Sequence, residues 1–173
     1  MKTGNRLTLV SFILAQFVFV FPAASSPELA CGDTITADTT LTEDLVCPAD
    51  AEYAIVIGAP NITLDLGGHI ISGHTPNTGV FSLEQEGITI RNGVIQGFNV
   101  GIFVIQANLA TMENLTVRNL DISDPDHMIF GIAIDSSQNV LVRDSYFEFI
   151  TSPAQAFLDV RGFAVQDVGG LQG

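Results

Sequence analysis

The segment Asp124-Pro125-Asp126-His127 brings residue types that can do chemistry into four consecutive positions. Two carboxylates beside an imidazole can bind Ca²⁺ through oxygen while the histidine acts as an acid or a base. We therefore take Asp124, Asp126 and His127 as candidate catalytic residues, with Ca²⁺ as the candidate cofactor. The alternative is a polar turn that Asp-Pro starts between two strands.

Three arginines form a second candidate group. Arg91, Arg118 and Arg143 each follow three residues of a similar type, in ITIR, LTVR and VLVR. This similarity predicts that the three arginines stack on one outer face of a repeat structure. Like charges about 5 Å apart repel, and a uronate or sulfate polymer would offset the repulsion by bidentate pairing. They are therefore candidate substrate-binding residues. The alternative is neutralisation within the protein, since Asp65 stands at the same position one repeat earlier, Asp144 follows Arg143, and Glu86 and Glu113 lie near adjacent turns.

The histidines show no zinc-ligand spacing. His69 follows two glycines and is expected to pack or form a hydrogen bond at a corner of the chain, and His74 is expected in an exposed turn. Asn61-Ile62-Thr63 and Asn114-Leu115-Thr116 match the N-glycosylation acceptor pattern. These residues therefore add no further catalytic candidate.

The elements that position these residues come from an internal repeat. Similar phrases recur roughly every 25 residues: NITLDLGGHIISG at Asn61, GITIRNGVIQGF at Gly87, NLTVRNLDIS at Asn114, NVLVRDSYFEF at Asn139 and GFAVQDVGG at Gly162. A fixed period of this size predicts stacked units, none of which can bury its apolar face alone.

Within each phrase apolar and polar residues alternate, which predicts short strands bounded by turn-forming Gly, Asn or Asp. A second strand recurs as GVFSL at Gly79, GIFVI at Gly101 and GIAID at Gly131. The alignment predicts one inward ladder and one corner ladder. They are Ile62, Ile88, Leu115, Val140 and Phe163, and Asn61, Gly87, Asn114, Asn139 and Gly162.

The phrases ITLDLGGHIISG and ITIRNGVIQGF resemble the opening coils of right-handed parallel β-helix proteins of the pectate-lyase-like superfamily. The segment CGDTITADTTLTEDLVCP resembles the N-terminal start of many secreted members. The resemblance covers residues 31–163. It implies an all-β fold, a right-handed parallel β-helix of about five coils, and a superfamily of lyases, hydrolases, alginate-modifying enzymes and noncatalytic surface proteins.

The chain departs from the catalytic patterns of that superfamily. It has no adjacent aspartate pair, no Gly-His-Gly and no Arg-Ile-Lys of the polygalacturonase type. Asp124 and Pro125 resemble the start of the Asp-Pro-His-Asp segment of mannuronan epimerases, but Asp126 and His127 stand in reversed order. The resemblance therefore specifies the fold and leaves the activity open.

The N-terminal residues have the three parts of a secretory signal peptide. Lys2 and Arg6 precede an apolar run at 7–21, and small residues follow. The run is shorter than the about 20 residues of a membrane span, so no membrane anchor is expected after cleavage. Export makes a disulfide between Cys31 and Cys47, the only cysteines, chemically reasonable. We therefore expect a signal peptide at 1–25, an N-terminal cap at 31–60 and repeats at 61–173.

Charge and composition exclude some functions. The net charge is −13, which makes nucleic acid an unfavourable partner. The chain is 47% hydrophobic and only 14% charged, which is typical of a packed domain rather than a disordered acidic chain. The sequence stops in mid-repeat at Gly-Gly-Leu-Gln-Gly. We expect missing coils or a partner to cover that C-terminal end.

Three classes of function fit these observations. The first is a secreted β-helix that binds, or once processed, an extracellular polysaccharide. The second is a polysaccharide lyase or epimerase that acts on uronate polymers through the Asp124 segment and an arginine. The third is a noncatalytic structural or adhesive surface protein.

Overall fold

The structure, a computed structural model, describes residues 29–74, 77–118, 130–148 and 163–172, and in these residues its regular elements are all β-strands. The strands are β1 (Asp33–Ile35), β2 (Thr39–Thr40), β3 (Leu45–Val46), β4 (Tyr53–Ile57), β5 (Thr63–Asp65), β6 (Ile70–Ser72), β7 (Thr78–Leu83), β8 (Thr89–Gln96), β9 (Val100–Ile105), β10 (Thr111–Arg118), β11 (Phe130–Asp135), β12 (Val140–Glu148) and β13 (Phe163–Gln172).

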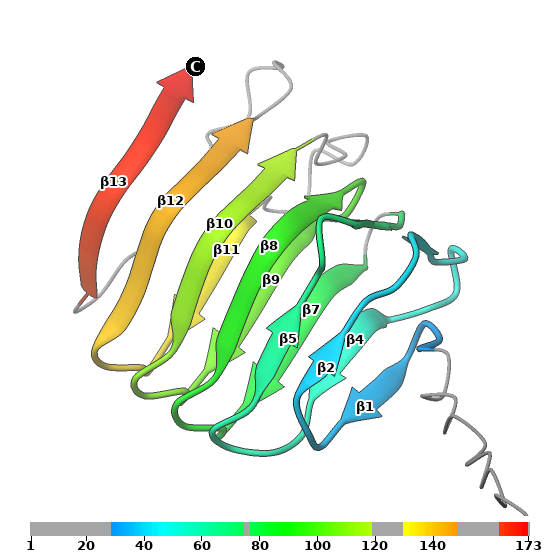
Figure 1. The fold of residues 1–173 in the computed structure, drawn as a ribbon, viewed down its shortest axis with the longest axis horizontal. Helices are drawn as coiled ribbons and strands as arrows, with labels where there is room; N and C mark the ends of the chain where they lie inside the picture. The colour runs from blue at the N-terminus through cyan, green and yellow to red at the C-terminus, as the bar shows by residue number, and fades with distance from the viewer. Residues whose placement is uncertain (1–28, 75–76, 119–129, 149–162, 173) are drawn as a thin grey trace, which may run out of the picture.

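The strands form two parallel sheets between which the chain alternates. One sheet has the order β1-β4-β7-β9-β11, and the other runs β13-β12-β10-β8-β5-β2, with β3 and β6 paired beside this path. We call them the five-stranded and the eight-stranded sheet. Figure 1 shows the two sheets stacked level by level from the N-terminal to the C-terminal end. The predicted all-β fold, a parallel β-solenoid, is confirmed.

The core consists of apolar side chains that repeat from level to level. In the five-stranded sheet Ile55, Val80, Ile102 and Ile132 lie in register, and each is at most 2% exposed. Leu64, Ile90, Met112 and Val142 form the matching row in the eight-stranded sheet. Burying each such side chain favours folding by about 1.5–3 kcal/mol before the entropy of ordering is subtracted.

Three glycines fix the close approach of neighbouring levels in the five-stranded sheet. Gly79, Gly101 and Gly131 stand at the same position of β7, β9 and β11, which confirms the predicted second strand of the repeat. A Cβ on Gly101 would lie 2.5 Å from the carbonyl oxygen of Gly131 and 2.5 Å from Cγ1 of Val117. A side chain therefore does not fit there without displacing backbone.

Three long strands of the eight-stranded sheet, β8, β10 and β12, each contain one non-glycine residue in the left-handed conformation. These residues are Asn92 in β8, Asn114 in β10 and Asp144 in β12, with φ of 60°, 51° and 50°. Asparagine and aspartate tolerate this conformation better than most residues. The bend reverses the inward and outward alternation, so that each long strand consists of two short segments with opposite parity.

This reversal explains an error in the predicted alignment of the repeats. Leu115 and Val117 are buried as expected, but Leu115 pairs with Gly93 and not with Ile88. LTVR forms the second half of β10, whereas the similar TIRN forms the first half of β8. The first half of β8 and the second half of β10 have the same alternation of apolar and polar residues. The sequence alignment therefore matched two segments that are not neighbours in the structure.

The predicted ladders change accordingly. Successive backbone hydrogen bonds from Thr89 to Ile62, Thr111 to Ile88 and Leu141 to Ala110 place Ala110 in the inward ladder where Leu115 was expected. The corner ladder contains Asn61, Gly87, Leu109 and Asn139, all with positive φ, so Leu109 takes the place predicted for Asn114. Gly162 lies outside the described residues.

The first level of the solenoid is closed by a disulfide between Cys31 and Cys47, as predicted. Their Cα atoms lie 5.5 Å apart, and Cys47 is 1% exposed. The bond ties the residues before β1 to the residue after β3. In the part of the chain that the structure describes, no helix is long and apolar enough to cross a bilayer. The predicted signal peptide at 1–25 lies outside the described residues.

Candidate functional site

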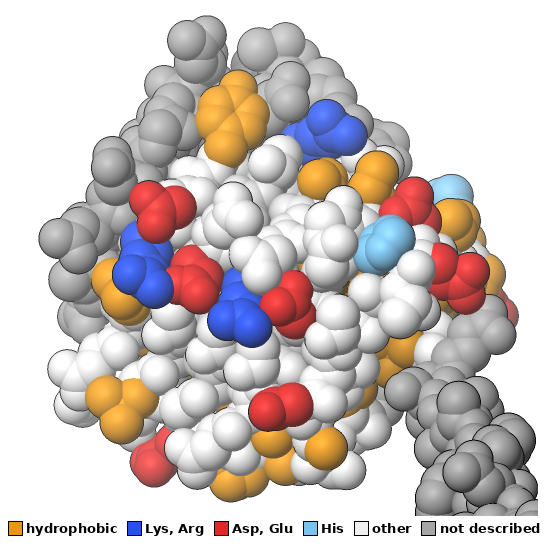
Figure 2. Space-filling view, viewed as in Figure 1, with side chains coloured by type: hydrophobic (Ala, Val, Ile, Leu, Met, Phe, Trp, Pro, Cys, Tyr) orange, Lys and Arg blue, Asp and Glu red, His pale blue; other side chains and the backbone are white. Residues whose placement is uncertain are grey.

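The outer side of the eight-stranded sheet carries a row of alternating charges, one residue per level. Asp65, Arg91, Glu113 and Arg143 occupy the same position in β5, β8, β10 and β12. Figure 2 shows this row as alternating red and blue side chains across the sheet. We call this outer side of β5, β8, β10 and β12 the polar face.

The charges of the row are paired within the protein. Nε of Arg91 donates a hydrogen bond to Oδ2 of Asp65 at 2.8 Å. Arg143 donates through both Nε and Nη2 to Oε2 of Glu113, with an Nε distance of 2.7 Å. The guanidinium side chains remain 42% and 48% exposed. The alternative of internal neutralisation is therefore confirmed for Arg91 and Arg143.

Asp65 is the most heavily engaged carboxylate of the face. Its burial alone would raise its pKa, but hydrogen bonds from the Gly67 backbone, Asn92 and Arg91, and the Arg91 charge, outweigh burial. The pKa of Asp65 is therefore lowered from its usual value. Because these donors come from its own turn and from the next level, Asp65 fastens two levels together.

Arg118 does not belong to the row, which corrects the prediction that the three arginines stack. Gln96 is its register partner in β8, and Ser72 is the partner of Gln96 in β6. Nε of Arg118 donates to Oε1 of Gln96 at 3.1 Å. The cause of the error is again the slip in the repeat alignment: Arg118 follows the bend at Asn114, whereas Arg91 precedes the bend at Asn92.

Side-chain amides run along the stack beside the charged row. Nδ2 of Asn92 donates to both carboxylate oxygens of Asp65 at 3.1 Å, and Nδ2 of Asn114 donates to Oδ1 of Asn92 at 3.0 Å. The polar face therefore presents a carboxylate or a guanidinium at each level, with side-chain amides beside them in β8 and β10, and the levels lie about 4.8 Å apart.

The prediction from the sequence missed Tyr146. This residue is 40% exposed and lies next to Thr116 on the outer side of the sheet. Strict alternation from Val142 would bury Tyr146, but the bend at Asp144 directs Tyr146 outward and leaves Phe147 only 5% exposed. The aspartate in RDSYF was the available signal, because aspartate is one of the residues that accept positive φ.

His69 and Asp44 form a pair across two levels. Nδ1 of His69 lies 3.2 Å from Oδ1 of Asp44, which also accepts the backbone N–H of Ile70 at 3.0 Å. The expected hydrogen bond of His69 at a corner is confirmed. The pair holds the turn after β5 against the segment before β3.

The predicted catalytic segment is not placed. Asp124, Asp126 and His127 lie outside the described residues. Elsewhere, over residues 29–74, 77–118 and 130–147, no group of three or more His, Cys, Asp or Glu side chains is arranged to hold a metal ion. The catalytic role of this segment therefore stays a prediction, and the described residues supply the polar face as a candidate binding surface.

Comparison with known proteins adds no relative. No protein-family model, no curated protein and no solved structure matches this chain. Fold and surface together define the class as a parallel β-solenoid with one charge-paired polar face.

Proposed function

We propose that this protein is exported and binds an extracellular polysaccharide with the polar face. One observation carries the proposal: hydrogen-bonding side chains recur at every level from Asp65 to Arg143 along one flat side of the stack. A polysaccharide repeats its hydroxyl groups along its length, so a protein surface that repeats its donors and acceptors can bind several sugar units in the same way. The Cys31–Cys47 disulfide is compatible with an oxidising, extracellular setting.

The ends of the polar face supply two further kinds of contact for a sugar, an aromatic ring and a guanidinium group. Tyr146 offers an exposed ring to the apolar side of a sugar ring. In the described part of the chain the ion pairs of arginine are those of Arg91 and Arg143, and Nε of Arg118 donates to the neutral Gln96 amide. A uronate carboxylate would pair with this guanidinium. A uronate-containing glycan is thus the preferred ligand.

Glycan binding to the full chain tests this proposal. Calorimetric titration with alginate, pectate and a neutral glycan should show binding that Arg118→Ala weakens by about tenfold or more for the uronate polymers. Arg118→Lys should restore it only in part, because lysine keeps the charge and loses the planar fork. Leu83→Ala, at a 44% exposed position of the other sheet, is the control. Binding that none of the polar-face variants changes would contradict the proposal.

The resemblance of ITLDLGGHIISG to the opening coils of the pectate-lyase-like superfamily supports the same function. The first alternative is a lyase or epimerase. Absorbance of unsaturated uronate, measured with and without Ca²⁺, would detect a lyase, and analysis of the uronate epimers would detect an epimerase. Turnover in either assay would replace the binding role with an enzymatic one.

A further inference from the structure

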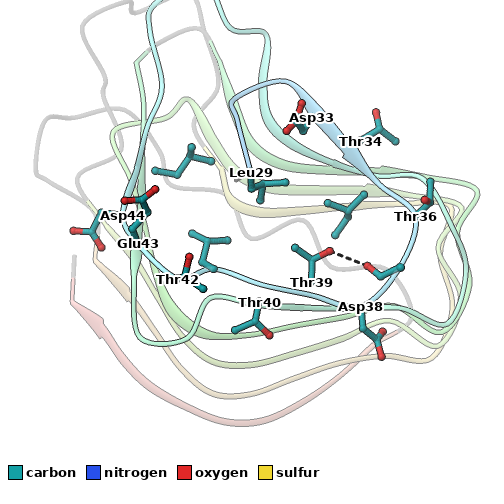
Figure 3. A pocket seen from close by; sticks show the side chains of 14 residues that line it. Leu29, Asp33, Thr34, Thr36, Asp38, Thr39, Thr40, Thr42, Glu43 and Asp44 are labelled. Atoms are coloured by element: carbon teal, nitrogen blue, oxygen red, sulfur yellow. Dashed lines mark hydrogen bonds between the residues drawn. The ribbon is translucent and has the colours of Figure 1, made fainter. Parts of the chain in front are cut away.

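The N-terminal end of the solenoid is hollow. A cavity of about 910 Å³ opens there, lined by Leu29 and by the continuous segment from Asp33 to Leu45. Figure 3 looks into this end and shows the first level of the chain surrounding the opening, with Leu29 at its inner side. The cavity lies outside the polar face and therefore belongs to a different surface.

Apolar side chains line part of the opening. Ile35 and Leu41 belong to the hydrophobic core at 5% exposure each, and Leu29 and Leu45 pack against that core while partly buried. At every later level, such side chains are covered by the next turn of chain. In the described residues no strand pairs with β1 or β2 on the side of the opening, and Leu29 and Leu45 remain only partly buried there.

The strands around the opening have free edges. β1 is the outermost strand of the five-stranded sheet, β2 ends the path of the eight-stranded sheet, and β3 pairs only with β6. The backbone N–H of Asp33 donates to the Ala30 carbonyl, and the other outer N–H and C=O groups of these strands are available to a further strand. An extended segment that pairs with such an edge gains main-chain hydrogen bonds and places alternate side chains inward.

The rim of the opening is acidic. Asp33, Asp38, Glu43 and Asp44 all line it, and no lysine, arginine or histidine does. In Figure 3 the side chains of Asp38, Glu43 and Asp44 point away from the interior. The structure uses one oxygen of each aspartate for backbone hydrogen bonds, from Ala30, Thr63 and Ile70 respectively. These bonds hold the three aspartate side chains in place, and Oδ1 of Asp44 also lies 3.2 Å from Nδ1 of His69.

The negative charge of the rim distinguishes between two possible occupants of the opening, a second copy of this chain and a cationic segment. A second copy of the chain docked end to end would bring four carboxylates against four more, and like charges in contact oppose association. A segment with lysine or arginine at alternate positions would place its cations on the rim and its apolar side chains in the cavity. Charge complementarity therefore favours a cationic strand of another protein.

We propose that the first level of this solenoid is a docking site for an extended partner segment in which apolar and cationic residues alternate. The segment adds a strand to β1 or β2, its apolar side chains fill the cavity, and its cations pair with the acidic rim. The proposal is independent of glycan binding, because the two surfaces share no residue.

Three probe peptides of about six residues, the usual length of a strand, test this proposal. One alternates lysine and valine, one alternates glutamate and valine, and one has the first composition with its lysines and valines in blocks. Titrated into the full chain, only the alternating lysine peptide should bind, and added salt should weaken its binding. Equal binding of the block peptide or of the glutamate peptide would overturn the proposal.

A rim variant supplies the second arm of the test. Asp33→Asn, Asp38→Asn, Glu43→Gln and Asp44→Asn together keep side-chain acceptors for the backbone N–H groups and remove the charge. The variant should bind the lysine peptide about tenfold more weakly. Hydrogen exchange on the wild-type complex should show new protection within residues 33–46. Protection confined to another part of the chain, or no binding by the wild type, would also overturn the proposal.

Discussion

The side-chain amide of Asn114 donates a hydrogen bond to the side-chain oxygen of Asn92 across 3.0 Å, although the two residues lie 22 positions apart in the sequence. Both have positive φ, and each occupies the bend of its strand. The side-chain amide of Asn92 in turn donates a hydrogen bond to the carboxylate of Asp65. The bends of successive levels are thus held together by side chains as well as by backbone.

Asp65 should make stability depend on acid pH. Its pKa is lowered below the usual value of an aspartate, so the stability it contributes is present above that usual value and is lost as pH falls through the lower folded pKa. Asp65→Asn should remove this part of the pH dependence. Urea unfolding of both proteins between neutral and strongly acidic pH measures it, with Asp50→Asn at an exposed position as the control. Parallel pH profiles for wild type and Asp65→Asn would contradict this expectation.

Gly101→Ala should destabilise the fold by about 1–3 kcal/mol, because the new Cβ meets the Gly131 carbonyl and Val117. Denaturant unfolding gives the value. The double variant with Val117→Ala removes one of the two clashing atoms, so its loss should be smaller than the sum of the two single losses. Simple additivity would show that the contact with Val117 is relieved in another way.

Leu109 occupies a corner position with φ of 60° while 59% exposed. Leucine is strained in this conformation and makes little packing contact there, so Leu109→Asn should stabilise the protein by about 0.5–1 kcal/mol. The reverse change, Asn139→Leu at the same corner one level later, should destabilise it. Thermal unfolding of both variants checks the pair, and a loss of stability in Leu109→Asn would count against the strain.

Two buried serines should respond oppositely to substitution. The Ser82 hydroxyl is buried without a hydrogen-bond partner among the described residues, and its register neighbour Val104 is apolar. Ser82→Val should therefore stabilise the protein by about 1 kcal/mol. Ser145→Ala should destabilise it, since that hydroxyl accepts from the Leu115 N–H and donates to the Arg143 carbonyl. Unfolding free energies that change in the same direction would be inconsistent with this difference.

Loss of the disulfide should cost about 3 kcal/mol, the entropy of a loop closed by residues 16 positions apart. Replacing Cys31 and Cys47 together by alanine tests this in denaturant unfolding. The wild type with reductant should lose a similar amount, whereas reductant should leave the alanine variant unchanged. An effect of reductant on the variant would point to a cause other than this bond.

The alternation of apolar and polar residues was sufficient to predict the solenoid, because short parallel strands bury one side and the repeat supplies the next level. It also placed Ile88, Ile90, Val140 and Val142 inside correctly. These residues precede the bends of their strands. The alternation of apolar and polar residues predicts burial correctly before each bend, because within one straight segment every second side chain points into the core.

The register of the levels could not be read in the same way. The levels differ in length: 26 positions separate Asp65 from Arg91, 22 separate Asn92 from Asn114, and 30 separate Glu113 from Arg143. Similar phrases can therefore belong to different segments, as with ITIRN and LTVRN. Which segments pair is decided by hydrogen bonds between levels, and these residues are distant in sequence. Arg118 was misplaced for this reason, whereas Tyr146 was missed because of the bend at Asp144.

The charged row repeats every second level, with a carboxylate between arginines and an arginine between carboxylates. Removing the single level that carries Arg91 would bring Asp65 beside Glu113, and duplicating it would set two arginines side by side. Like charges in adjacent strands oppose pairing. This side of the molecule can therefore lengthen or shorten without electrostatic cost only by two levels at a time.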